Sequence, residues 1–571
     1  MFPAAGFLAA ALGLVSPDGA LAQTSARDSI LIERILDSLS VRERAAQVVM
    51  PWIPGAYTAF DDSAFTVYQG WVDSLRVGGI IVSAGSPLDV AARLNRLQSR
   101  SRLPLLIAAD LEGGTSGRLL GGTPFPTNMG VAAAGDEQDA YEMGRITALE
   151  GRAAGIHLTF SPVADVNNNP ANPIINTRSF GEDPWLVARL VSATVRGLQD
   201  HGMLATVKHF PGHGDTGTDS HLALPVIGAG WRRLDSLELV PFRAAVEAGA
   251  ALVMAGHLAL PRLSRDSLRP ATLDPGMLTG VLRDSLGFAG TVVTDALDMG
   301  GVAGRYGPGE AAVQALLAGA DLLLQPADPR IAIEALAGAV QAGRVSRERL
   351  DRSVRRILGL KMQLGLFRRR TVPLDSVPLT VGSARFLATA RDIAQRSLVL
   401  VSDSLGTVDS LRAAPRRIAL ITYGEENAGT VGTRLANDLR TYGHTVTTFR
   451  LWPASGVASH DSVRVLVRSH PYVVVAVSAR VNPWKGSVGV PRPVAALMDA
   501  LSRQRRTVFV SFGSPYIALQ TRHARAYLLA WTANALTEAA VARALSGRAP
   551  ITGQLPVALP PAWGLGAGLH R

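Results

Sequence analysis

Short apolar runs alternate with segments of helical periodicity from about residue 45 to residue 330. The runs, rich in β-branched residues, are Ala46–Ile53, Gly79–Ser83, Leu103–Asp110, Leu158–Asp165, Leu204–His209, Leu252–His257, Thr291–Asp295 and Ala320–Gln325. The segments between them repeat apolar residues every three to four positions, as in Ser86–Leu97, which opens with a serine N-cap, a first-turn proline and a capping-box acid at Asp89. Eight strand–helix units in succession predict a closed (β/α)8 barrel of the TIM type.

The ends of these runs carry side chains that can do chemistry. Five runs end in a carboxylate or an imidazole, namely Asp110, Asp165, His209, His257 and Asp295. Barrel enzymes place their catalytic groups at the C-terminal ends of the strands. The pattern therefore predicts an active-site rim at that end of the barrel.

A second alternation follows a proline-containing stretch. Its apolar runs are Ser397–Ser402, Arg417–Thr422, Thr445–Leu451, Tyr472–Ser478, Thr507–Phe512 and Tyr527–Trp531. Helical segments between parallel strands are typical of an open α/β sandwich, and the stretch contains no phosphate-loop fingerprint. We expect a barrel over 30–366, a linker over 367–383 and an α/β sandwich domain over 384–571.

The first 22 residues have the pattern of a signal peptide. An apolar stretch from Ala4 to Val15 is followed by the small-residue sequence Ala20-Leu21-Ala22, although no Lys or Arg precedes the stretch. The stretch is too short to span a bilayer. We therefore expect export to the periplasm or the medium, with cleavage after Ala22 and no membrane insertion afterwards.

Composition narrows the class of protein. Hydrophobic residues make up 47% of the chain and charged residues 18%, which is typical of a globular protein. The net charge of +11 would suit an anionic polymer, but the basic residues are scattered, so we expect no nucleic-acid partner. The absence of cysteine excludes disulfides, zinc–thiolate sites and a thiol nucleophile.

The segment from Lys208 to His221 is the most informative loop. It holds His209, His213 and His221 together with two aspartates, among glycines and a proline. Histidine and aspartate are ligands that zinc and iron prefer, so a metal site is one interpretation, and a polar surface loop is another. The glycines and the proline favour a mobile loop over a rigid metal cage.

Asp295 offers a second kind of chemistry. A carboxylate that closes a barrel strand can attack an anomeric carbon and form the covalent intermediate of a retaining glycosidase. Many strands end in aspartate, so this feature acquires meaning only in combination with the loop.

Together the two segments resemble glycoside hydrolase family 3, specifically its β-N-acetylglucosaminidase branch. The motifs are K-H-F-P-G-H-G over 208–214, D-S-H over 219–221, T-D-A-L-D-M over 294–299, D-x-E-G-G over 110–114 and R-S-F-G-x-D-P over 178–184. They occur in the order that the family shows, and the resemblance extends from about residue 30 to residue 560.

The resemblance implies a role for each matching position. Asp295 matches the catalytic nucleophile, and Asp219 and His221 match a dyad in which histidine is the general acid/base and aspartate orients it. Residues that match sugar-binding positions are Asp110, Arg178, Lys208 and His209, with His257 near the same pocket. The resemblance also implies a carbohydrate substrate, no metal and no cofactor, and leaves His213 and Asp215 as structural parts of the loop.

The chemistry of the dyad agrees with this assignment. Histidine titrates near neutrality and can both donate and accept a proton. Asp219 precedes His221 by two residues, so in a loop its carboxylate can reach one ring nitrogen and fix the tautomer. The β-glucosidases of the family instead take a glutamate from the C-terminal domain. We therefore expect the C-terminal domain here to be a scaffold or accessory domain without a catalytic residue.

These observations favour a retaining exo-β-N-acetylglucosaminidase that hydrolyses muropeptide or chitin-type fragments. A β-N-acetylglucosaminide phosphorylase is an alternative, and Asp219 and His221 disfavour a β-glucosidase or β-xylosidase. A catalytically silent glycan-binding protein is disfavoured because Asp295 and the dyad are intact. A metallohydrolase is the remaining alternative.

Overall fold

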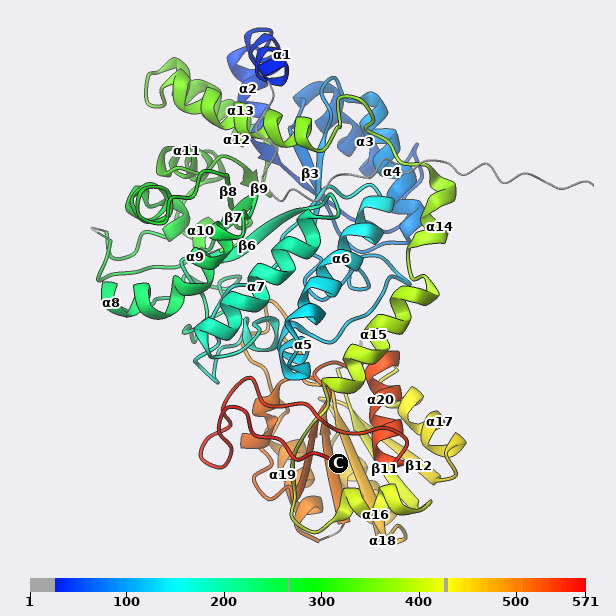
Figure 1. The fold of residues 1–571 in the computed structure, drawn as a ribbon. Coiled ribbons are helices and arrows are strands. Elements are labelled where there is room, and N and C mark those ends of the chain that lie inside the picture. Colours follow the sequence, from blue (N-terminus) through cyan, green and yellow to red (C-terminus); the bar gives the residue numbers. More distant parts are fainter. Residues whose placement is uncertain (1–25, 265, 426–429, 505) are drawn as a thin grey trace, which may run out of the picture.

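The computed structural model of the chain describes residues 26–264, 266–425, 430–504 and 506–571. The expected signal peptide, residues 1–22, lies outside the described residues. The chain forms two α/β units, seen in Figure 1 as a barrel above and a second sheet with its helices below. Within the described ranges no helix is both long and apolar enough to cross a bilayer.

Seven parallel strands of the first unit form one curled sheet in which neighbours follow the order of the chain. They are β2 (Trp52–Ile53), β3 (Gly79–Val82), β4 (Leu106–Ala109), β5 (Leu158–Thr159), β6 (Leu204–Phe210), β7 (Leu252–Ala255) and β8 (Thr291–Thr294). Each coincides with one of the apolar runs, which confirms the predicted α/β barrel class.

The ring of strands closes through β1 (Val49–Met50) and β9 (Leu323–Leu324). These two strands pair in parallel, and Leu322, just before β9, forms a bridge with Val293 of β8. β1 and β2 belong to one apolar run, which Pro51 divides into two strands. Proline has no N–H to donate to a neighbouring strand, so the pairing stops there. The expected strand over 158–165 is shorter for the same reason, since Pro162 interrupts it.

Helices surround the barrel between the strands. They are α1 (Ala26–Asp37), α2 (Val41–Gln47), α3 (Ser63–Gly70), α4 (Pro87–Arg100), α5 (Asn128–Ala134), α6 (Glu137–Ala153), α7 (Pro184–Gln199), α8 (Trp231–Arg233), α9 (Val240–Glu247), the π-helical η5 (Gly276–Ser285), α10 (Gly300–Ala303), α11 (Pro308–Ala318), α12 (Pro329–Gln341) and α13 (Arg347–Gln363). In α4 the buried residues Val90, Leu94 and Leu97 show the predicted periodicity. Ser86 is its N-cap, but the expected capping-box contact is not formed, because the serine side chain makes no cap hydrogen bond.

The second unit is a six-stranded sheet in the order β10-β15-β14-β13-β11-β12. Its strands are β10 (Val399–Asp403), β11 (Arg417–Tyr423), β12 (Thr445–Leu451), β13 (Tyr472–Val477), β14 (Arg506–Ser511) and β15 (Ala526–Leu529). The expectation of parallel strands throughout was wrong at one edge, because β10 runs antiparallel to β15. An apolar run does not encode the direction of a strand, and an antiparallel edge strand on a parallel sheet is common. The helices of this unit are α16 (Thr407–Ala413), α17 (Thr433–Thr441), α18 (Val457–Arg468), α19 (Arg492–Gln504) and α20 (Ala535–Leu545).

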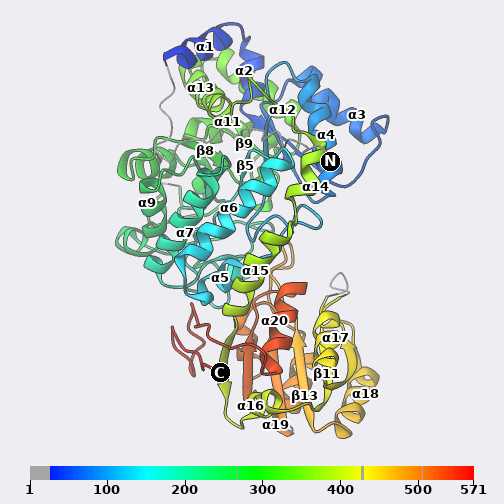
Figure 2. The ribbon, with the colours of Figure 1, turned by 45° about the vertical axis from the view of Figure 1, so that its right-hand side comes forward.

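The segment between the units follows the side of the barrel. Figure 2 shows α14 (Val377–Thr380) and α15 (Ala384–Arg396) leading from the barrel to the second sheet. Asn95 exchanges two hydrogen bonds with the backbone of Val372, at 2.8 and 2.9 Å. Arg396, at the end of α15, pairs with Asp139 of α6 at 2.6 Å. The segment is therefore attached to the barrel at both ends.

Candidate active site

A cavity of about 700 Å³ lies at the C-terminal ends of the barrel strands and is lined by both units. The barrel contributes the segments that follow β4, β6 and β8. The second unit contributes the loop after β13, which includes Arg480 and Trp484, and the segment after β15 that begins at Trp531. Six residues expected at the site line this cavity, namely Asp110, Arg178, Lys208, His209, His221 and Asp295.

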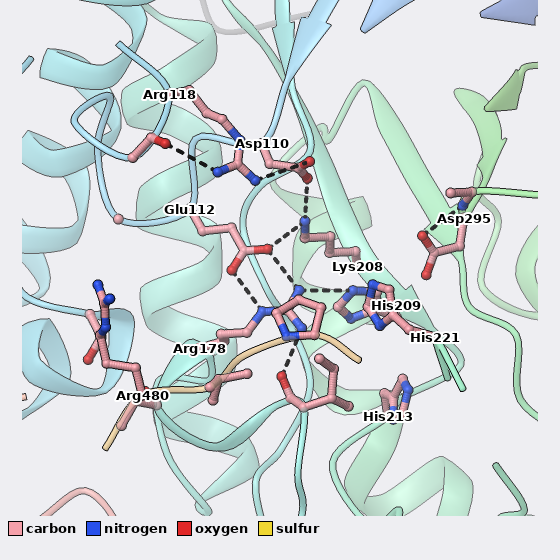
Figure 3. A pocket seen from close by; sticks show the side chains of 18 of the residues that line it. Asp110, Glu112, Arg118, Arg178, Lys208, His209, His213, His221, Asp295 and Arg480 are labelled. Atoms are coloured by element: carbon pink, nitrogen blue, oxygen red, sulfur yellow. Dashed lines mark hydrogen bonds and ion pairs between the residues drawn. The ribbon is translucent and has the colours of Figure 1, made fainter. Parts of the chain in front are cut away.

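An ion-pair network forms one wall of the cavity. Lys208 Nζ lies 3.0 Å from Asp110 Oδ1 and 2.6 Å from Glu112 Oε1, and Arg178 donates two hydrogen bonds to Glu112 at 2.8 and 2.9 Å. Figure 3 shows Lys208 between the two carboxylates and Arg178 below Glu112. Arg118 also lines the cavity and lies 3.8 Å from Asp110, so three cations face two anions along this wall.

Lys208 and Glu112 keep their charges inside the protein. Burial lowers the pKa of Lys208, but Asp110 and Glu112 raise it by more, so that it lies above its ordinary value. Burial raises the pKa of Glu112, but Arg178 and Lys208 hold it well below its usual range. The wall therefore presents charged donors and acceptors at fixed positions, which suits the hydroxyl groups of a sugar.

His209 is fixed by a buried aspartate that follows β5. Its Nδ1 lies 2.7 Å from Asp165 Oδ2, while its Nε2 lies 3.3 Å from Arg178 Nη2. Asp165 Oδ1 also accepts a hydrogen bond from the backbone N–H of His213 at 2.6 Å. Because the carboxylate accepts a hydrogen bond from the Nδ1–H, the lone pair of Nε2 faces the guanidinium.

His213 belongs to the support of the loop. Its Nδ1 lies 2.6 Å from the hydroxyl of Thr216, and burial lowers its pKa to about 4. Asp215 pairs with Arg233 at 2.7 Å. Both residues therefore have the structural contacts that the sequence led us to expect.

Asp295 follows β8 directly and faces the cavity. Its Oδ1 accepts a hydrogen bond from the N–H of Ala296 at 2.8 Å. Burial raises the pKa of Asp295, but His257, His209, His221 and that N–H lower it by more, so the pKa lies below its ordinary value. Asp295 is therefore an anion at neutral pH, as a nucleophile must be.

His257 lies behind Asp295 and outside the lining of the cavity. It is fully buried, its Nε2 lies 2.8 Å from the carbonyl of Ala296, and its Nδ1 lies 2.8 Å from the hydroxyl of Thr272. Both ring nitrogens are thus engaged by the protein. These contacts hold His257 against the segment that carries Asp295, and its expected contact with the sugar stays a prediction.

Asp219 and His221 form the contact that their spacing predicts. Asp219 Oδ1 lies 2.8 Å from His221 Nδ1 and also accepts the backbone N–H of His221 at 3.0 Å. The side chain of Asp219 is fully buried, whereas that of His221 is 23% exposed. The aspartate thus fixes the ring from inside, and the histidine is the member of the pair that reaches the cavity.

The sequence did not reveal two contributors to the site. Glu112 lies within the D-x-E-G-G motif, and its position there was the signal that could have identified it. Trp484 comes from the C-terminal unit and donates its backbone N–H to Asp219 Oδ2 at 2.9 Å. The expectation that this unit serves only as a scaffold or accessory domain is therefore corrected, because it contributes to the wall of the cavity.

Known proteins resemble the chain over both units. Residues 40–360 match the glycosyl hydrolase family 3 N-terminal domain. A β-N-acetylglucosaminidase/β-glucosidase from Cellulomonas fimi is 33% identical over 514 residues, which cover 86% of this chain and 90% of that protein. The solved structure of a glycoside hydrolase family 3 β-N-acetylglucosaminidase from Paenibacillus sp. str. FPU-7 is 33% identical, with a TM-score of 0.81 over 91% of this chain and 99% of that one.

A solved β-glucoside phosphorylase is also similar, with 28% identity and a TM-score of 0.85 over 93% of this chain and 97% of that one. The named activities of these proteins differ, while the fold and the family are shared. The chain therefore belongs to glycoside hydrolase family 3 and is a glycoside hydrolase.

Proposed function

We propose that the protein is a retaining exo-β-N-acetylglucosaminidase that removes terminal β-linked N-acetylglucosamine from muropeptides or chitin-type oligosaccharides. The observation that carries this proposal is the Asp219–His221 pair, which reaches the same cavity as the ionised Asp295. A histidine acid/base on a barrel loop is the feature that separates this branch from enzymes with two carboxylates. The name of the Paenibacillus relative supports the same sugar, and the Cellulomonas fimi relative is named for this activity together with that of a β-glucosidase.

In the first step Asp295 attacks the anomeric carbon and the glycosidic bond breaks. His221 gives its proton to the leaving oxygen, while Asp219 holds Nδ1 so that Nε2 faces the substrate. The products of this step are a covalent glycosyl–aspartate and a released alcohol.

In the second step the neutral His221 takes a proton from water, and the resulting hydroxide attacks the anomeric carbon. The bond to Asp295 breaks, the carboxylate is restored, and the sugar leaves with its original β configuration. One imidazole thus serves as the acid in the first step and as the base in the second, because the nitrogen that gives up its proton can then accept one.

Recognition of the sugar falls to the ion-pair wall. We propose that Asp110, Arg178, Lys208 and His209 hold the hydroxyls and the N-acetyl group, with Glu112 fixing the two cations. Hydrogen bonds to charged groups are the stronger ones, and a fixed network loses little freedom on binding. The wall therefore favours one orientation of the terminal sugar over Asp295.

Phosphorolysis is the second candidate, and the similarity to a β-glucoside phosphorylase favours it. A histidine is neutral after it has donated its proton, so it repels phosphate less than a carboxylate would. We nevertheless propose water as the acceptor. The proposed export would bring the enzyme into a medium where conserving a sugar phosphate gains little for the cell.

Turnover of two nitrophenyl glycosides, with and without millimolar phosphate, tests these choices. We expect a higher kcat/KM for the β-N-acetylglucosaminide than for the β-glucoside, and free N-acetylglucosamine as the product in both buffers. A preference for the glucoside would make the protein a β-glucosidase, and N-acetylglucosamine 1-phosphate as the main product would make it a phosphorylase. Binding without turnover of either glycoside would identify a silent glycan-binding protein.

We also propose that the reaction needs no metal or cofactor. The imidazole of His209 lies between Asp165 and the cation of Arg178, and that arrangement would repel a metal ion from its Nε2. EDTA should leave the rate unchanged. Loss of activity that zinc restores would contradict the proposal and return the loop to a metal site.

A further inference from the structure

The barrel fixes the backbone of the dyad loop next to the nucleophile. The carbonyls of Ser220 and His221 accept hydrogen bonds from the N–H groups of Gly301 and Gly300, both at 3.1 Å. A Cβ on Gly300 would lie 2.6 Å from the carbonyl oxygen of Leu222, so the close approach requires glycine there. These contacts set where the loop runs.

The side chains of the dyad receive a further constraint from the other unit. Trp484 donates its N–H to Asp219 Oδ2 at 2.9 Å, and Asp219 Oδ1 is already engaged by His221. The ring of Trp484 lies 5.2 Å from the imidazole of His221 at an interplanar angle of 63°. One residue of the C-terminal unit thus contacts both members of the pair.

The backbone of Trp484 is strained where it makes these contacts. Its φ is 73°, in the left-handed region that bulky side chains rarely adopt. The indole is 59% exposed, so burial of the ring does not offset that strain. Strain of this kind persists where the surroundings impose it, and it is concentrated at functional sites.

The loop around Trp484 is attached at several points. Lys485 pairs with Glu425, and Asn482 donates a hydrogen bond to the same carboxylate at 3.4 Å. A Cβ on Gly486 would lie 3.2 Å from Leu222, the residue after His221. The loop is therefore anchored in its own unit and packed on the dyad loop.

We propose that Trp484 is a positioning residue for proton transfer: its N–H orients Asp219, and its ring fixes the plane of His221. The inference rests on the proposed acid/base role of His221. It places part of the control of leaving-group protonation in the C-terminal unit, while the nucleophile and the sugar-binding wall remain with the barrel. Trp484 itself does not exchange a proton.

The test compares aryl β-N-acetylglucosaminides whose leaving groups need little protonation, such as 2,4-dinitrophenyl, or much, such as phenyl. Trp484→Gly removes the ring, keeps the N–H and relieves the backbone strain, because glycine adopts a φ of 73° freely. We expect kcat/KM to fall about 10- to 100-fold for the phenyl substrate and less than about threefold for the dinitrophenyl substrate, as for impaired general-acid catalysis. Trp484→Phe should recover most of the loss.

A matched control is Trp185→Ala, which removes an exposed indole from α7 outside the cavity and should leave both rates unchanged. Equal losses on the two substrates in Trp484→Gly would overturn the inference and make the ring a platform for the leaving group, and unchanged rates would overturn the positioning role of the ring. His221→Ala belongs in the same series. If its losses do not depend on the leaving group, the proposed function fails; if they do and those of Trp484→Gly do not, only the present inference fails.

Discussion

Two buried lysines lie at opposite ends of the barrel and differ in what surrounds them. Lys208, at the C-terminal end of β6, lies between Asp110 and Glu112, which outweigh the effect of burial and raise its pKa. Lys361, on α13 near the N-terminal end of β1, donates a hydrogen bond to the amide of Gln47 at 2.8 Å. Burial, aided by a nearby arginine, lowers the pKa of Lys361 to about 7.

The different surroundings of the two lysines indicate that one end of the barrel serves substrate binding and the other end serves stability. At the C-terminal end of the barrel the protein arranges opposite charges around its cation, and the charged wall can then bind substrate. At the other end the buried amine of Lys361 has a neutral partner and a nearby arginine, so its charged form costs free energy of folding. Barrel enzymes carry function at the first end and stability at the second, and the two lysines give a way to test that division here.

The largest effect is expected at Asp295, the proposed nucleophile. Asp295→Ala should lower turnover about 10⁴-fold or more, because no covalent intermediate can form. The Tm should change little, since Asp295 makes few contacts beyond the N–H of Ala296. Steady-state kinetics and thermal unfolding of the same preparation measure both. A variant that kept more than about one percent of the activity would show that Asp295 is not the nucleophile.

The proposed acid/base pair should give a loss that depends on the substrate. His221→Ala should lower kcat/KM about 100- to 1,000-fold for phenyl β-N-acetylglucosaminide and far less for the dinitrophenyl glycoside, which needs little protonation. The slope of the rate against the pKa of the leaving group measures this. An unchanged slope would count against His221 as the acid.

Lys208→Met should affect both activity and stability. It leaves Asp110 and Glu112 without their shared cation, so we expect kcat/KM to fall about 10- to 100-fold and the free energy of unfolding to fall by about 3 kcal/mol. Denaturant unfolding and kinetics provide the two values. Loss of stability with full activity would place Lys208 in the structure alone.

Lys361→Met is the matched change at the other end, and its effect on activity should be nil. In wild type the folded state binds a proton on Lys361 only below about pH 7, whereas the unfolded chain binds it up to about pH 10.4. Wild-type stability therefore rises with pH across this window, and the full penalty is present below it.

The methionine variant removes that penalty. It should be more stable than wild type by about 1 to 3 kcal/mol near pH 6, with a smaller gain near pH 10, after allowing for the hydrogen bond lost by Gln47. Unfolding at the two pH values measures the gain. A variant less stable at pH 6 would mean that Lys361 contributes to folding through its charge.

Much of the barrel could be predicted because each strand is a continuous apolar run, and a run of this kind shows in the sequence. The Asp219–His221 contact could also be predicted from the sequence, because two residues that are two positions apart in a loop lie close together. In both cases the information is local in the chain.

The remaining features depend on how distant segments pack. Trp484 reaches Asp219 only because the two units are in contact at the cavity. No pattern in either segment of the sequence indicates that contact. The direction of β10 and the supporting role of His257 are likewise set by neighbours that the sequence does not place. For the direction of β10 and for the part that the C-terminal unit plays in the cavity wall, the structure corrected the expectation.

Trapping the glycosyl-enzyme tests the central claim most directly. In His221→Ala the first step remains fast for dinitrophenyl β-N-acetylglucosaminide, while the second lacks its base, so the intermediate should accumulate. Mass spectrometry of the digested protein should find one N-acetylglucosaminyl group on the peptide that contains Asp295. An adduct on another residue, or none while dinitrophenol is still released, would contradict catalysis through Asp295.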